Sequence, residues 1–249
     1  MRVVLQHSFI LHTRPFNETS LILDTFTQSH GRVHLLAKGV RLARSPYRGL
    51  LRPFTPLLIS WAGKTELMSL SRAEPAGAPL DLTGNSLLTG LYLNELLVRL
   101  LPRFDAYSAV FNAYQETLRA LLNDSHQERH LRLLERTLLM ELGYGFSLDK
   151  ETGNGKTILS DQFYLFIPGH GLNRCRSDDS ADMIFKGKSL LALHRGSLLD
   201  PEDLRHAKRL HRLAIAFLLG NDTLRSRDLF RKPVLPFDPF MPNETTVEA

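Results

Sequence analysis

The spacing of apolar residues changes near residue 80, and this change divides the chain into two unlike parts. Before it, short runs rich in leucine, aromatic and β-branched residues alternate with turn-forming residues, which is typical of β-strands. After it, leucines recur at helical spacing. A single regular pattern does not account for both parts, so we expect an α+β protein with domains over residues 1–80 and 81–232.

The first part predicts a small β-barrel. Its expected strands are Val3–Leu11, Ser20–Phe26, Arg32–Lys38, Leu57–Trp61 and Glu66–Leu70. Five short strands fit a closed OB-type barrel better than a sandwich, because closure removes exposed strand edges. Gly31 allows a tight connection between the second and third strands. The segment from Glu74 to Pro79, with two prolines and a glycine, should end the β pattern.

The second part predicts an α-helical domain. Apolar side chains surround a first helix over residues 87–101, so this helix should be the buried centre of the domain. Its polar edge consists only of Asn94, Glu95 and Arg99. Three more long helices and two short ones, near residues 188–194 and 225–231, complete the domain.

Capping residues predict where the three later long helices begin and end. The expected N-caps are Asp105, Ser125 (in a capping box with Glu128) and Asp200 (followed by Pro201). The expected stops of the last two are Gly143 and Gly220. Residues 146–182 lack helical periodicity and predict a small β-rich insert, with Phe163–Ile167 as its clear strand. Residues 233–249 contain four prolines and predict a loosely ordered tail, docked if at all through Phe237 and Phe240.

The stretch from Thr25 to Thr65 contains seven lysines and arginines and no carboxylate. Residues 1–80 as a whole carry ten basic residues against four acidic ones, whereas the remainder carries twenty-one against twenty-two. A basic N-terminal domain attracts polyanions, so we expect nucleic-acid phosphates to bind there. The expected DNA contacts are Arg32, Lys38, Arg41, Arg44, Arg48 and Arg52.

Other interpretations of this stretch stay open. Its aromatic residues stack on bases only if they point outward; otherwise the stretch is a solvated basic face over an aromatic core. Those aromatics are Phe26, Tyr47, Phe54 and Trp61. Attraction to a membrane surface competes, but without a run of about 18 uncharged apolar residues we expect no membrane span.

The sequence predicts neither secretion nor catalysis. The apolar run at the N-terminus is interrupted by polar residues and lacks a cleavage site, and the single cysteine, Cys175, is consistent with a reducing cytoplasm. Residues 153–157 resemble the end of a phosphate-binding loop, but Lys150 occupies the position of its first glycine. His170 and Cys175 are too few for a zinc site. We expect no catalytic residue, no metal and no cofactor.

Arginines and lysines recur at helical spacing on two of the expected helices. One set is Arg129, Arg132 and Arg136, and the other is Arg205, Lys208, Arg209 and Arg212. Such a face beside leucines predicts a site for an acidic, apolar peptide. The alternative is surface arginines paired with Glu128, Glu135 or Glu202.

Six short segments resemble the bacterial recombination mediator family RecO, in family order. They are residues 14–20, 30–39, 50–56, 90–97, 141–145 and 224–230. The resemblance implies an OB domain, a helical domain and a zinc-finger-like insert. Four-cysteine members of the family hold zinc there, but this chain has residues 148–153 in place of the first cysteine pair and only Cys175 near the second. The insert should therefore hold together by packing alone.

The resemblance also implies a non-enzymatic role in DNA repair and recombination in the cytoplasm, at the nucleoid. The implied activities are binding single- and double-stranded DNA, annealing strands, binding the acidic C-terminal tail of single-stranded-DNA-binding protein, and acting with RecR to load RecA. The tail-binding residues implied by position are Arg132 and Arg205, with Leu133 and Leu142 as apolar partners and Arg129 and Arg209 beside them. An RNA-binding OB module and a hydrolase using His170 or Cys175 remain the alternatives.

Overall fold

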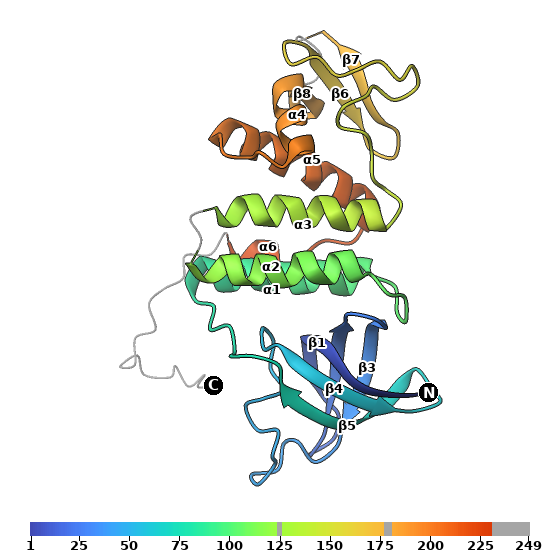
Figure 1. The fold of residues 1–249 in the computed structure, drawn as a ribbon, viewed down its shortest axis with the longest axis vertical. Helices are drawn as coiled ribbons and strands as arrows, with labels where there is room; N and C mark the ends of the chain where they lie inside the picture. Colours follow the sequence, from blue (N-terminus) through green and yellow to red (C-terminus); the bar gives the residue numbers. More distant parts are fainter. Residues whose placement is uncertain (124–125, 177–180, 231–249) are drawn as a thin grey trace, which may run out of the picture.

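The computed structural model describes residues 1–123, 126–176 and 181–230. Figure 1 shows the five-stranded barrel at one end of an elongated molecule and a small sheet at the other end. Helices α1 (Gly84–Leu100), α2 (Ser108–Asn123) and α3 (Gln127–Glu141) cross the middle. Helices α4 (Gly187–Arg195) and α5 (Pro201–Leu219) lie between α3 and the small sheet.

The expected OB barrel is present. Its strands are β1 (Arg2–Pro15), β2 (Leu21–Thr27), β3 (Gly31–Ala37), β4 (Leu57–Ala62) and β5 (Leu67–Pro75). They close in the order β1-β2-β3-β5-β4, with β4 returning to β1 and only the β3–β5 pair parallel. The end of the β pattern was predicted too early. β5 continues beyond Leu70 to Pro75, because its residues up to Pro75 still pair with β4.

The aromatics of the basic stretch belong to the interior. Trp61 and Phe26 are fully buried and Phe54 is 6% exposed, so only Tyr47 remains partly accessible. The barrel's own core contains Trp61 with apolar residues from all five strands, which on β5 are Met68 and Ala73. Phe26 and Phe54 instead join the helical core, where Phe26 packs edge-on against Phe111 at 5.3 Å. Base stacking on these three rings is therefore excluded, and the interpretation as an aromatic core holds for them.

Asn94, expected on a polar edge of α1, is buried at the junction of the two domains. Its amide donates to the carbonyl of Leu11 on β1 at 2.9 Å and accepts from the Tyr114 hydroxyl on α2 at 2.6 Å. The helical pattern alone does not show this, because Asn94 faces a second domain rather than solvent. A buried amide with both groups satisfied fixes how barrel and helices meet.

The helix ends agree with the predicted caps only in part. Asp200 is the N-cap of α5 and accepts from the backbone N–H of Glu202, and the helix ends at Gly220, as expected. α2 begins at Ser108, beyond the predicted cap Asp105, because Ser108 donates to the carbonyl of Gln28 in the barrel. Ser125 lies outside the described residues, and the N-cap of α3 is His126.

The insert between α3 and α5 is a three-stranded sheet. Its strands are β6 (Phe163–Ile167), β7 (Gly171–Cys175) and β8 (Ile184–Lys186), in the order β7-β6-β8. The predicted strand is confirmed, whereas β7 and β8 are too polar or too short to show in the sequence. Aromatic packing holds the sheet, with the Phe166 ring 4.6 Å from Phe146. Within the described ranges, no three His, Cys, Asp or Glu side chains are grouped to hold a metal.

Candidate nucleic-acid interface and peptide pocket

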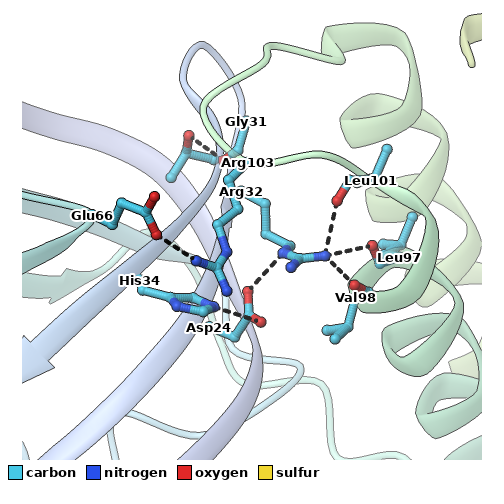
Figure 2. A network of polar contacts seen from close by, with 10 residues as sticks. Asp24, Gly31, Arg32, His34, Glu66, Leu97, Val98, Leu101 and Arg103 are labelled. Carbon is cyan, nitrogen blue, oxygen red and sulfur yellow. Dashed lines mark hydrogen bonds and ion pairs between the residues drawn. The ribbon is translucent and has the colours of Figure 1, made fainter.

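Arg32, one of the expected DNA contacts, points into the junction between barrel and helices. Figure 2 shows its guanidinium between Asp24 and the end of α1. Its Nε lies 3.2 Å from the Asp24 carboxylate, and its Nη1 donates to the carbonyls of Leu97, Val98 and Leu101. These carbonyls lie at the C-terminal end of α1, where helical partners run out. Arg32 is 8% exposed and donates to carbonyls at a helix end, so the structure places it in the domain junction and not among the exposed cations of the barrel.

Two further ionic contacts lie at the junction between the barrel and the helices. Asp24 also contacts the His34 imidazole at 3.1 Å, and Arg103 pairs with Glu66 at 3.0 Å. A Cβ at Gly31, whose φ is +63°, would lie 1.8 Å from the Asp105 carbonyl oxygen. Glycine is therefore required there both for its φ and for this close approach.

The connection between β3 and β4 carries the basic residues that do face solvent. Lys38, Arg41, Arg44 and Arg48 are exposed on residues 38–48. Arg41 is held in place, because its backbone N–H donates to the Thr19 carbonyl at 3.0 Å and its Nη1 to the Asn17 carbonyl at 2.8 Å. These bonds fix the start of a connection that otherwise consists of turns.

A hollow of about 440 Å³ lies on this connection. Of the described residues, Arg41, Tyr47 and Arg48 line it together with five uncharged residues, and none of these eight carries a carboxylate. Lys38 and Arg44 are exposed on the same connection, outside the lining. Arg52 pairs with Asp81 at 2.9 Å, but both side chains are at least half exposed, so this pair is weak. The structure thus brings Arg41 and Arg48 together and separates them from Arg32.

A larger pocket of about 740 Å³ opens between the helices. Its lining mixes cationic and apolar side chains with few acidic ones. The lining residues are Thr89, Tyr92, Leu121, Gln127, Glu128, Leu131, Arg132, Lys208, Arg212, Arg227 and Phe230. Sequence spacing found Arg132, Lys208 and Arg212, whereas Arg227 and Phe230 come from a segment far along the chain and were missed.

Arg132 reaches this pocket from a buried ionic network. Its Nη1 donates to the Glu135 carboxylate at 2.7 Å, which also accepts from the Tyr92 hydroxyl at 2.7 Å and contacts the His211 imidazole at 3.1 Å. Burial opposes ionisation of Glu135, but Arg132 and the hydrogen bonds from His211 and Tyr92 outweigh it and lower the pKa of Glu135. The predicted alternative, an arginine paired with Glu135, therefore holds for Arg132. Its Nε nevertheless has no hydrogen-bond partner among the described residues.

The short helix α6 (Ser226–Leu229) completes the pocket wall. The Glu95 carboxylate on α1 accepts from the backbone N–H groups of Arg225 at 2.9 Å and Ser226 at 2.8 Å. Although partial burial acts in the opposite direction, these bonds lower the pKa of Glu95. Arg227 then lies over the Tyr92 ring, 5.7 Å from its centroid, and its Nη2 has no hydrogen-bond partner in the described part of the chain.

The other expected peptide-binding residues lie outside the pocket lining. Arg129 donates to the Gly196 carbonyl at 2.9 Å, and its neighbour on the same face, Arg136, donates to the Leu193 carbonyl at 3.0 Å, so both cap α4. Arg209 donates to the Ile184 carbonyl and stacks on Phe185. Helical spacing alone cannot separate such structural arginines from accessible ones. Arg205, Leu133 and Leu142 are also absent from the lining.

The residues suggested for a hydrolase do not come together. His170 precedes β7 and Cys175 ends it. A five-residue strand is about 16 Å long, so these two side chains cannot share a proton directly. A separate cluster places the Ser189 hydroxyl 2.6 Å from Asp203 and 2.9 Å from His206. Ser189 is 3% exposed and its proton is donated to Asp203, so this cluster ties α4 to α5.

The fold is that of an OB-barrel protein with an appended helical domain. An exposed cationic connection on such a barrel is the kind of surface that OB proteins use on nucleic acids. Residues 1–79 match the family model described as "Recombination protein O N terminal", and residues 82–228 match "Recombination protein O C terminal".

Curated relatives agree with the family models. The chain is 46% identical over 232 residues to DNA repair protein RecO of Nitrosococcus oceani, covering 93% of this chain and 94% of that protein. It is 45% identical over 228 residues to the Coxiella burnetii protein of the same name, covering 92% and 98%. Identity to the Yersinia pestis protein is 42% over 237 residues, covering 94% and 98%. The chain belongs to the RecO family of DNA repair and recombination proteins, which confirms the resemblance seen in the sequence.

Family membership and the helices of the structure each bear on one of the earlier expectations. The family is one of recombination mediators. Among the helices of the described residues, none combines the length and apolar character needed to cross a membrane.

Proposed function

We propose that this chain binds single- and double-stranded DNA through the β3–β4 connection and binds the acidic C-terminal tail of single-stranded-DNA-binding protein in the helical pocket. With RecR, it would then help to load RecA onto DNA, in the cytoplasm and at the nucleoid. The observation that carries the proposal is the separation of two cationic sites on two domains. One is an exposed connection lined by Arg41 and Arg48, and the other is a pocket lined by cations and apolar residues.

The barrel site suits a nucleic-acid backbone. Its cations are exposed, and the described residues that line the hollow include no carboxylate to neutralise them. Each phosphate contact releases counterions from the nucleic acid, so affinity should fall steeply with salt. Neutralising two strands on one protein also lowers the repulsion between them, which gives annealing without a catalytic step.

The helical pocket suits an acidic peptide with an apolar anchor. Lys208 and Arg212 are exposed at its rim, and Arg132 and Arg227 add positive charge to its lining. Leu121 and Leu131 give it an apolar lining. Charge-assisted hydrogen bonds to carboxylates together with a buried apolar side chain are a common basis for recognising short peptides.

One titration tests both halves of the proposal. Fluorescently labelled single-stranded DNA, RNA of equal length and the acidic tail peptide would each be titrated with the protein at two salt concentrations. We expect DNA and the peptide to bind without displacing one another. Mutual displacement would show that the two sites are one, and preference for RNA over DNA would favour an RNA-binding module instead.

A further inference from the structure

The helical pocket contains more positive charge than its own residues satisfy. Among the described residues, four cationic side chains and one carboxylate, that of Glu128, line it, and Arg132 is also paired with Glu135, which does not line the pocket. Lys208 lies 3.7 Å from Glu128, whereas Arg132 Nε and Arg227 Nη2 are buried and without a hydrogen-bond partner among the described residues. The cations that an occupant can reach are the exposed Lys208 and Arg212, so the pocket favours an occupant that brings carboxylates.

The described chain ends at the wall of this pocket. Phe230, the last residue before 231–249, lines it, and α6 is anchored beside it by Glu95. Residues 231–249 lie outside the described residues. Their sequence begins with Arg231 and Lys232, and from residue 233 onward it contains three carboxylates and no lysine or arginine.

The sequence of this segment is complementary to the pocket. Its acidic residues are Asp238, Glu244 and Glu248, and its apolar residues include Val234, Leu235, Phe237, Phe240 and Met241. It contains prolines at 233, 236, 239 and 242, and a sequence with proline at every third position disfavours a helix. Asp238 lies between the two phenylalanines, so one carboxylate and an aromatic anchor are adjacent.

The segment is also within reach. Phe237 is seven residue steps beyond Phe230, and an extended chain of seven steps spans at most about 23–25 Å. Because the tether starts at the pocket wall, the effective concentration of the segment at the pocket is on the order of millimolar. Even a weak intrinsic affinity then gives substantial occupancy.

We infer that residues 233–244 occupy the helical pocket in cis, with Phe237 and Phe240 on its apolar lining and Asp238 facing its cations. This inference rests on the proposed function of the same pocket as a site for acidic peptides. The segment is then a competitor that a partner's acidic tail must displace. Occupancy of about 70–90% would weaken binding of an outside peptide about three- to ten-fold.

The experiment uses the full chain throughout. A fluorescein-labelled peptide with the sequence of residues 233–244 is titrated with the wild-type chain and with the variant Phe237→Ser/Phe240→Ser. We expect the variant to bind the labelled peptide about three- to ten-fold more tightly, because its own segment no longer competes. Adding Arg212→Glu to the variant should abolish this gain, whereas adding Arg205→Glu, on the same helix but outside the pocket, should preserve it.

The outcomes separate this inference from the proposed function. Equal affinity of the two chains for the labelled peptide, or no binding to either, overturns occupancy in cis. The acidic tail peptide of single-stranded-DNA-binding protein is titrated in parallel. If it binds both chains equally, the pocket functions without the segment and only this inference falls. If it binds neither chain, the proposed function of the pocket falls as well.

Discussion

The Nε of Arg32 lies 3.2 Å from the carboxylate of Asp24, and this pair sits between the barrel and the end of α1. Asp24 on β2 and Arg32 on β3 thus align one guanidinium with three helix carbonyls. A basic residue in a phosphate-attracting stretch is thereby used to join domains. DNA affinity and stability should consequently respond to different arginines.

Arg32→Gln should destabilise the fold. It leaves Asp24 buried without its main partner and the α1 carbonyls without a cap, at a cost of about 2–4 kcal/mol in the free energy of unfolding. Urea unfolding monitored by the fluorescence of Trp61, the single tryptophan, measures this loss. In the folded fraction, DNA affinity should be unchanged. If Arg32→Gln has wild-type stability but binds DNA more weakly, Arg32 contacts DNA and the prediction is wrong.

The triple variant Arg41→Ala/Arg44→Ala/Arg48→Ala should lose DNA affinity and keep its stability, the reverse of Arg32→Gln. These side chains are exposed, so stability should change little, while affinity for DNA falls. Each lost phosphate contact reduces the slope of log affinity against log salt by about 0.7 for single strands. Arg195→Ala, an exposed arginine at the end of α4, is the matched control. An unchanged slope would remove the β3–β4 connection from the interface.

Arg212→Glu should weaken binding of the acidic peptide by about ten-fold or more, since it replaces attraction by repulsion at the pocket rim. Arg205→Glu makes the same change of charge outside the pocket and should leave peptide affinity nearly unchanged. Fluorescence anisotropy with a labelled peptide compares the two. Equal losses would mean that general charge attraction, not the pocket, binds the peptide.

Stability should decrease as the pH falls below about 6.5, the usual pKa of histidine. Burial lowers the pKa of His211, outweighing its contact with Glu135, so the unfolded chain takes up a proton that the native chain does not. One such group changes the free energy of unfolding by at most about 1.4 kcal/mol per pH unit. His211→Gln should flatten the dependence between pH 6.5 and 5.5 in urea titrations. Burial also lowers the pKa of His206, so some slope should remain. If His211→Gln leaves the pH dependence of the free energy of unfolding unaltered, His211 is not its source.

Gly31→Ala and Gly49→Ala form a matched pair, because both glycines have positive φ. Gly49 faces open space, so alanine there should cost only the conformational penalty of about 1–2 kcal/mol. At Gly31 the new Cβ would also meet the Asp105 carbonyl, and the loss should exceed that at Gly49 by at least about 1 kcal/mol. Urea unfolding of both variants tests this. Equal losses in the free energy of unfolding would mean that the backbone near Asp105 moves to accommodate the added methyl group.

Helices and strands that are specified by residues close together in the sequence were predictable. The strands of the barrel, the cap of α5 at Asp200 and the strand Phe163–Ile167 each depend on neighbouring residues, and each is present. The start of α2 was not predictable, because Ser108 donates to a carbonyl in the barrel. Asn94 was assigned to a polar edge for the same reason, since its partners belong to β1 and α2.

The sequence by itself determined the two kinds of domain, the family and the concentration of positive charge in the barrel, because these follow from periodicity, motifs and composition. Only the tertiary structure decided which cations remain available. Within the part of the chain that the structure describes, Arg32, Arg129 and Arg136 donate to carbonyls at helix ends, whereas Arg41, Arg48 and Arg212 do not, and no spacing rule distinguishes the two groups. The physical reason is that a guanidinium satisfies a helix end as readily as a phosphate, and which of the two it meets depends on packing between segments far apart in the chain.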